Sequence, residues 1–134
     1  MEGDRARLRD LSTRLVRLHK VLLDRERRAY EQRHGSIPSG ELLRLLLHDE
    51  QFSWLRVLSA MIAEIDAIVD ADEPLEHENA QNVFREAYRL LKSGGAGAFQ
   101  DKYHVALQES PDVVMAHADV SRVLPASTAA SGSP

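Results

Sequence analysis

The amino-acid sequence predicts an all-α fold, a compact bundle of about six helices around a central amphipathic helix, with a long helix at the N-terminus. Of the 134 residues, 43% are hydrophobic and 28% are charged, which is typical of a soluble globular domain. Aromatic residues make up only 5%, whereas Leu, Ala, Arg and Glu are abundant, and this composition favours helix over strand. Apolar side chains also recur at steps of three and four residues along most of the chain, which is the period of a helix.

The first helix is expected from about residue 4 to residue 33. Its leucines alternate at steps of three and four, but the stripe stops at Arg25, too early for a regular coiled coil. Gly35 provides a helix end, because glycine readily adopts a left-handed conformation. Since the leucines lie close to the N-terminus, we expect them to extend beyond the intramolecular core and to form a partner-binding patch of Leu8, Leu11, Leu15, Leu18 and Leu22.

The predicted centre of the fold is a helix over about residues 50–71. A short leucine-rich helix precedes it, with Ser39 as a candidate N-cap, and Asp49 is placed to cap the central helix. An apolar sector runs from Trp54 to Val69. The opposite side carries a strip of small residues that would let a second helix approach closely, namely Ala60, Ala63, Ala67 and Ala71. A helix that can pack on two sides is expected to be the core.

Three further helices and a tail complete the prediction. Pro74 separates the central helix from one over about residues 77–92, and the glycine-rich stretch 93–97 predicts a break before a fifth helix. Ser110-Pro111 begins a sixth helix, because serine is a favoured N-cap and proline suits the first turn. Residues 125–134 are small, polar and aperiodic, so we expect a disordered tail after a single helical domain of residues 1–124.

An acidic segment crosses the end of the central helix. From Glu64 to Glu78 there are seven acidic residues and no Lys or Arg. Asp70 and Asp72 lie near a helix C-terminus, where the macrodipole disfavours negative charge, so a cation is expected beside them. Arginines of the first helix are one source and a divalent metal is the other. The segment is not an EF-hand, because Leu75 stands where that loop requires glycine.

Several function classes are excluded by composition and motif. The chain has no cysteine, which excludes disulfides, thiolate zinc sites and cysteine nucleophiles. No apolar run approaches the roughly 18 residues of a membrane span, and the charged N-terminus lacks the apolar core of a secretion signal. We therefore expect a cytoplasmic protein without a membrane partner. The common nucleotide-binding, zinc-protease and hydrolase motifs are missing, and no cofactor is predicted.

Candidate metal ligands are restricted to histidines and carboxylates. The pairs Glu31-x-x-His34 and Asp101-x-x-His104 have the acid-x-x-His spacing of di-iron bundles, but no matching pair stands on the central helix. A histidine inside an apolar stripe, as His117 is, is usually a core residue with one hydrogen bond, for example to a backbone carbonyl. No metal site is therefore predicted. If the histidines converge on one cavity, the candidate ligands are His48, Asp101, His104 and His117.

Bulky aromatic side chains stand near the start of the central helix. Phe52 and Trp54 could wall a small-molecule pocket, since such pockets are often lined by aromatic residues. A chain with so few aromatic residues needs them to close the end of the bundle, and we favour this structural role.

The favoured function is that of a non-enzymatic interaction or oligomerisation protein, either a homodimer or a partner of another helical protein. The alternative is a metal-dependent or small-molecule-binding helical-bundle enzyme that uses His and Asp ligands. Nucleic-acid binding is ranked last, because the net charge is −4. It would use the basic residues of the first helix, namely Arg5, Arg7, Arg9, Arg14 and Arg17.

Overall fold

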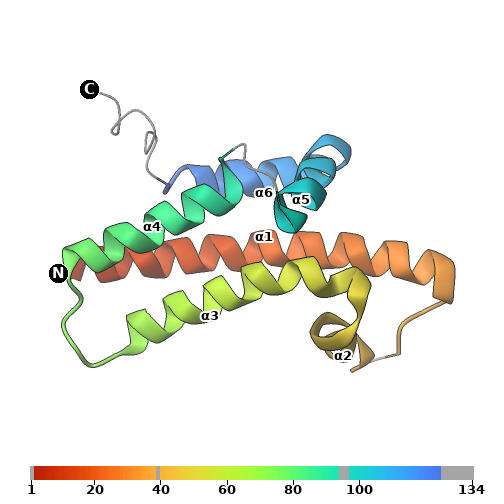
Figure 1. Cartoon of the computed structure of the whole chain (residues 1–134), viewed down its shortest axis with the longest axis horizontal. Helices are drawn as coiled ribbons and strands as arrows, with labels where there is room; N and C mark the ends of the chain where they lie inside the picture. The colour runs from red at the N-terminus through yellow and green to blue at the C-terminus, as the bar shows by residue number, and fades with distance from the viewer. Residues whose placement is uncertain (1, 39, 94–96, 125–134) are drawn as a thin grey trace.

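The computed structural model describes residues 2–38, 40–93 and 97–124 (Figure 1). In these ranges the chain forms six α-helices, one 3-10 helix and no strand, which confirms the all-α prediction. The expected tail, residues 125–134, and the expected N-cap, Ser39, lie outside the described residues. The elements in order are α1 (Glu2–His34), α2 (Glu41–His48), η1 (Glu50–Leu55), α3 (Arg56–Asp70), α4 (His77–Leu91), α5 (Ala98–Glu109) and α6 (Pro111–Ser121).

The helix at the centre of the bundle is α1, and the prediction that residues 50–71 hold this place is wrong. α1 runs across the middle of the molecule with α3 on one side and α4 and α6 on the other (Figure 1). It contacts α3, α4, α6 and η1. With 33 residues it is about 50 Å long, so it can contact helices placed along its whole length.

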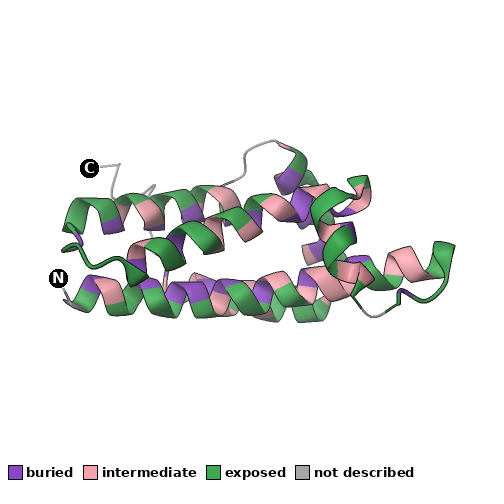
Figure 2. Ribbon diagram, turned by 90° about the horizontal axis from the view of Figure 1, so that it is seen from below, coloured by how far each residue is buried: buried purple, intermediate pink, exposed green. Residues whose placement is uncertain are grey.

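The leucine stripe of α1 is the core of the molecule. Its five leucines, Leu8, Leu11, Leu15, Leu18 and Leu22, are each 0% exposed. The expectation that they form an exposed partner-binding patch is therefore wrong, because the helices that pack along α1 cover them. Figure 2 shows the same pattern, with buried positions recurring along the helices between exposed outer faces.

Residues 50–71 form two elements, of which η1 contacts α1, α2 and α5, whereas α3 packs on α1. Asp49 caps the first of them as expected, since its side chain accepts a hydrogen bond of 2.8 Å from the Gln51 backbone N–H, but the element is the 3-10 helix η1. The buried residues of α3 include Leu58, Ile65 and Val69. The alanine strip faces solvent, because all four of its members are exposed, which corrects the prediction of a second helix packed against Ala60, Ala63, Ala67 and Ala71.

Arg5 of α1 holds the C-terminal end of α3. Its guanidinium donates hydrogen bonds of 2.6 to 3.2 Å to four backbone carbonyl oxygens, those of Ile68, Val69, Ala71 and Glu73. The expected cation near Asp70 and Asp72 thus comes from the first helix. It binds two of the last carbonyls of α3, where the negative end of the helix dipole lies, and two carbonyls of the segment that follows, and not the carboxylates.

Polar contacts also join α1 to α3 and α6 beside the leucine stripe. The Ser12 hydroxyl donates to Asp66 Oδ1 of α3 at 2.6 Å. Arg14 donates to Asp119 Oδ1 of α6 at 2.8 Å. At the start of α6, Ser110 accepts from the Val113 backbone N–H, as the Ser110-Pro111 signal predicts. No helix of the described residues is both long and apolar enough to cross a membrane.

Candidate functional site

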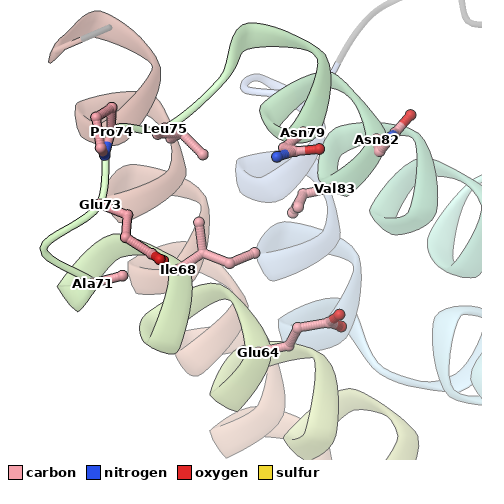
Figure 3. A pocket seen from close by; sticks show the side chains of 9 residues that line it. All are labelled: Glu64, Ile68, Ala71, Glu73, Pro74, Leu75, Asn79, Asn82 and Val83. Atoms are coloured by element: carbon pink, nitrogen blue, oxygen red, sulfur yellow. The ribbon is translucent and has the colours of Figure 1, made fainter.

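A groove between α3 and α4 is the candidate functional site (Figure 3). The two helices follow each other in the chain and both contact α1. The space between them has a volume of about 330 Å³, and a smaller hollow of about 110 Å³ continues it along the same two helices. We call the two spaces together the α3–α4 groove. Its lining residues are Met61, Glu64, Ile65, Ile68, Ala71, Glu73, Pro74, Leu75, Asn79, Asn82, Val83 and Glu86.

The α3–α4 groove combines an apolar interior with acidic edges. Figure 3 shows Ile68 of α3 and Val83 of α4 pointing toward each other across the space. Glu64, Glu73 and Glu86 supply carboxylates, while none of the lining residues is Lys or Arg. In the described part of the chain, the carboxylates of Glu64 and Glu73 make no ion pair. The groove therefore presents uncompensated negative charge beside apolar surface.

Contacts with α1 fix both walls of the groove at one end. Arg5 holds the end of α3, as described above. On the other wall, His77 at the start of α4 places its Nδ1 2.8 Å from Asp4 Oδ2. This hydrogen bond, with a smaller contribution from the charge of Arg7, holds the pKa of the Asp4 carboxyl below its usual value. The guanidinium of Arg7 also lies 4.6 Å from the ring centre of Phe84. Arg5 therefore lies at one end of the groove, where it binds the backbone of Glu73, and it forms no ion pair with the Glu73 carboxylate.

The residues proposed as metal ligands do not come together. His48 is exposed at the end of α2, and Asp101 and His104 are exposed on α5. His117 is half-buried on α6 and its Nδ1 lies 2.6 Å from the Tyr103 hydroxyl. The expected single hydrogen bond is present, but its partner is a side chain and not a backbone carbonyl. Among the residues that the structure describes, no three His, Asp or Glu side chains are grouped so as to hold a metal ion.

A second histidine makes a half-buried side-chain hydrogen bond between helices. His19 of α1 places its Nε2 2.7 Å from the Ser59 hydroxyl of α3. Burial lowers the pKa of His19, and burial together with the charge of Lys92 lowers the pKa of His117. Burial also raises the pKa of Tyr103. These groups are neutral near pH 7, so the two pairs join α1 to α3 and α5 to α6 as neutral hydrogen bonds.

The histidine pKa shifts predict a loss of stability in mild acid. The unfolded chain has ordinary histidines with a pKa of about 6.5, so it binds more protons than the folded chain just below that pH. The contribution of His19 to stability is therefore present above about pH 6.5 and is lost as the pH falls toward the lowered folded-state pKa. In urea unfolding between about pH 7 and pH 5, His19→Gln should flatten this loss. The control variant His104→Gln changes an exposed histidine and should show the same pH dependence as wild type. An unchanged slope of unfolding free energy against pH in His19→Gln would contradict the prediction.

The sequence indicates the acidic α3 edge of the groove but not its α4 wall. The acidic run 64–78 predicts a cation beside the end of α3, but it does not by itself predict that the carboxylates border a groove. The α4 wall is not predicted, because Val83 has the helical spacing of core residues such as Ala80 and Ala87. Asn79 and Asn82, one helical turn apart on that wall, were a detectable signal of a polar edge.

Comparisons with protein-family models, with curated proteins and with solved structures found no match to this chain.

Proposed function

We propose that the protein is a non-enzymatic interaction protein that binds a basic amphipathic helix of a partner protein in the α3–α4 groove. The observation that carries this proposal is the combination of apolar lining and unpaired carboxylates in a groove without a lining cation. Two neighbouring helices that leave a groove between them are a common receptor for a third helix. The cytoplasmic location expected from the sequence stays a prediction.

The chemistry of the groove specifies the occupant. Apolar residues of the partner at positions i, i+3 or i+4, and i+7 would contact Met61, Ile68 and Val83. Lysine or arginine on both sides of that stripe would meet Glu64 and Glu73. A neutral or acidic helix would leave these carboxylates beside a partner that offers them no cation, so charge selects against it.

The other candidate functions have less support. A dimer built on the leucine stripe would need residues that are buried within one chain. A metal-dependent enzyme would need ligands that converge, and the four candidate residues lie apart on three helices. Arg5 and Arg14, two of the five arginines considered for nucleic-acid binding, are engaged in intramolecular hydrogen bonds.

A synthetic peptide tests the proposal directly. A labelled peptide of about 18 residues, with leucine on one face and lysine on the other, is long enough to form a helix on binding. Its binding, measured by fluorescence anisotropy, should weaken with increasing salt and should be about tenfold weaker in Glu64→Lys. Asp112→Lys makes the same change of net charge on α6 and should bind the peptide nearly as wild type.

Controls separate groove binding from general attraction to an acidic protein. A scrambled peptide of identical composition carries the same charge without an apolar face, so it should bind at least about tenfold less tightly. Equal binding of the scrambled peptide, or equal weakening by Glu64→Lys and Asp112→Lys, would reject the groove as the binding site. If light scattering shows a dimer that Glu64→Lys dissociates, the groove binds a second copy of this chain and the proposed partner is wrong.

A further inference from the structure

A second pocket lies far from the α3–α4 groove. It has a volume of about 270 Å³ and is bounded by α1, η1 and α5. At about 1.5 Å per residue, Glu26 is roughly 30 Å along α1 from Arg5, which contacts the end of the groove. We call it the Glu26 pocket, and its lining residues are Arg25, Glu26, Trp54, Asp101, Lys102 and Val105.

Glu26 is a buried carboxylate that no cation neutralises. The residue is 9% exposed, and within the described ranges no Lys, Arg or His forms an ion pair with it. Trp54 Nε1 donates to its Oε1 at 2.9 Å and Gln51 Nε2 donates to its Oε2 at 3.1 Å. Both donors are neutral, so they satisfy the oxygens without cancelling the charge. A buried charge without a counter-ion is unfavourable, and a bound cation would relieve that cost.

The hydrogen bonds around Glu26 are themselves held in place. Arg33 donates to Gln51 Oε1 at 2.6 Å, which directs the amide NH₂ group of Gln51 toward Glu26. The indole ring of Trp54 packs against the ring of Phe99, with 5.5 Å between the ring centres. The two donors to the carboxylate are thus themselves held by contacts with Arg33 and Phe99, which is the kind of support that a binding site requires.

The remaining walls supply one free cation and an apolar surface. Lys102 on α5 is exposed and makes no ion pair in the part of the chain that the structure describes, whereas Arg25 is paired with Glu109. Asp101 also lines the pocket, and no ion pair among the described residues joins its carboxylate to Lys102. Trp54 and Val105 provide the apolar part. An anionic group, a cationic group and apolar surface therefore line the same small space.

We propose that the Glu26 pocket binds a small zwitterion, an α-amino acid with an apolar side chain. Its ammonium group would pair with Glu26 and its carboxylate with Lys102, and its side chain would lie against Trp54 and Val105. The volume is slightly below the roughly 300–1,000 Å³ of pockets for drug-sized ligands, which suits a single amino acid better than a peptide. This site is independent of the proposed groove partner.

The chain carries its own probe for this pocket, since Trp54 is the only tryptophan. Titration with L-phenylalanine or L-leucine should change tryptophan fluorescence in a saturable manner. N-acetyl-L-phenylalanine lacks the ammonium group and phenethylamine lacks the carboxylate, so each should bind at least about tenfold more weakly than L-phenylalanine. Lys102→Gln should weaken binding of L-phenylalanine about tenfold and should leave phenethylamine unaffected.

Two variants test the pocket itself. Glu26→Gln keeps an oxygen that accepts the Trp54 hydrogen bond but removes the charge, so it should abolish the response. Val105→Arg fills the pocket from a 45% exposed position and stays informative if Glu26→Gln does not fold. Its matched control is Val114→Arg on α6, where the valine is 46% exposed and does not line the pocket, and this variant should bind as wild type.

Three results would overturn the proposal. The first is no saturable fluorescence change with either amino acid. The second is a Val105→Arg protein that binds as tightly as Val114→Arg. The third is equal binding of phenethylamine and L-phenylalanine, because the ligand would then be an amine and not a zwitterion.

Discussion

Leu15→Ala should lower the free energy of unfolding by about 2–5 kcal/mol. Leu15 is 0% exposed in the middle of the α1 stripe. Its neighbours Ser12 and Arg14 are hydrogen-bonded to α3 and α6, so helices on both sides hold this part of α1 in place. The surrounding side chains cannot easily close the space left by the lost methyl groups, and a cavity adds to the lost burial.

The adjacent residue provides the control for this measurement. Val16 is 49% exposed, so Val16→Ala should change the free energy of unfolding by no more than about 1 kcal/mol. Urea denaturation followed by circular dichroism compares both variants with wild type. If Leu15→Ala left the unfolding midpoint unchanged and altered the oligomeric mass, the leucines would lie at an interface between chains, as their position in the sequence first suggested.

The elements of this fold could be predicted because their signals are local. The leucine steps of α1 and the Ser110-Pro111 start of α6 each depend on residues within one or two helical turns. The same holds for Asp49, whose side chain caps η1 through a contact two residues away. Propensity, capping and periodicity act over this range, so a single sequence records them.

The arrangement of the helices could not be predicted from the same signals. The strip of alanines along residues 60–71 predicts a packing surface, but alanine is also the best helix former on an exposed face. Sequence periodicity identifies the apolar side of each helix, but it does not identify which helix lies at the centre of the bundle. The length of α1 was the better indicator, because only a helix that spans the molecule can contact most of the others.

The two candidate sites differ in how far the sequence could reveal them. The acidic edge of the α3–α4 groove lies in one segment and was visible as a run of carboxylates. Glu26 stands among Arg25, Arg27 and Arg28, which predicts a solvated acid paired with its neighbours. Its contact with Trp54 joins residues 28 positions apart and depends on how η1 packs on α1. Such a long-range contact leaves no mark in a single sequence.

Trp54→Phe should lower the free energy of unfolding by about 3 kcal/mol. The smaller ring leaves unfilled space, and the loss of the indole N–H removes one of the two neutral donors to the Glu26 carboxylate. An acceptor that stays charged and buried without its donor costs more than the hydrogen bond contributed. Circular dichroism in urea measures this change, because Trp54→Phe has no tryptophan fluorescence.

A double-mutant cycle with Glu26→Leu isolates the part of this loss that belongs to the hydrogen bond. In the wild-type background, Glu26→Leu leaves the Trp54 N–H buried without an acceptor. In the Trp54→Phe background there is no indole N–H to leave unpaired, and Glu26→Leu removes a buried carboxylate that already lacks this donor. The loss in free energy of unfolding of the double variant should therefore be about 1–3 kcal/mol smaller than the sum of the losses of the two single variants. If the effects add to within about 0.5 kcal/mol, the hydrogen bond contributes little, and the carboxylate is solvated enough to need neither Trp54 nor a bound cation.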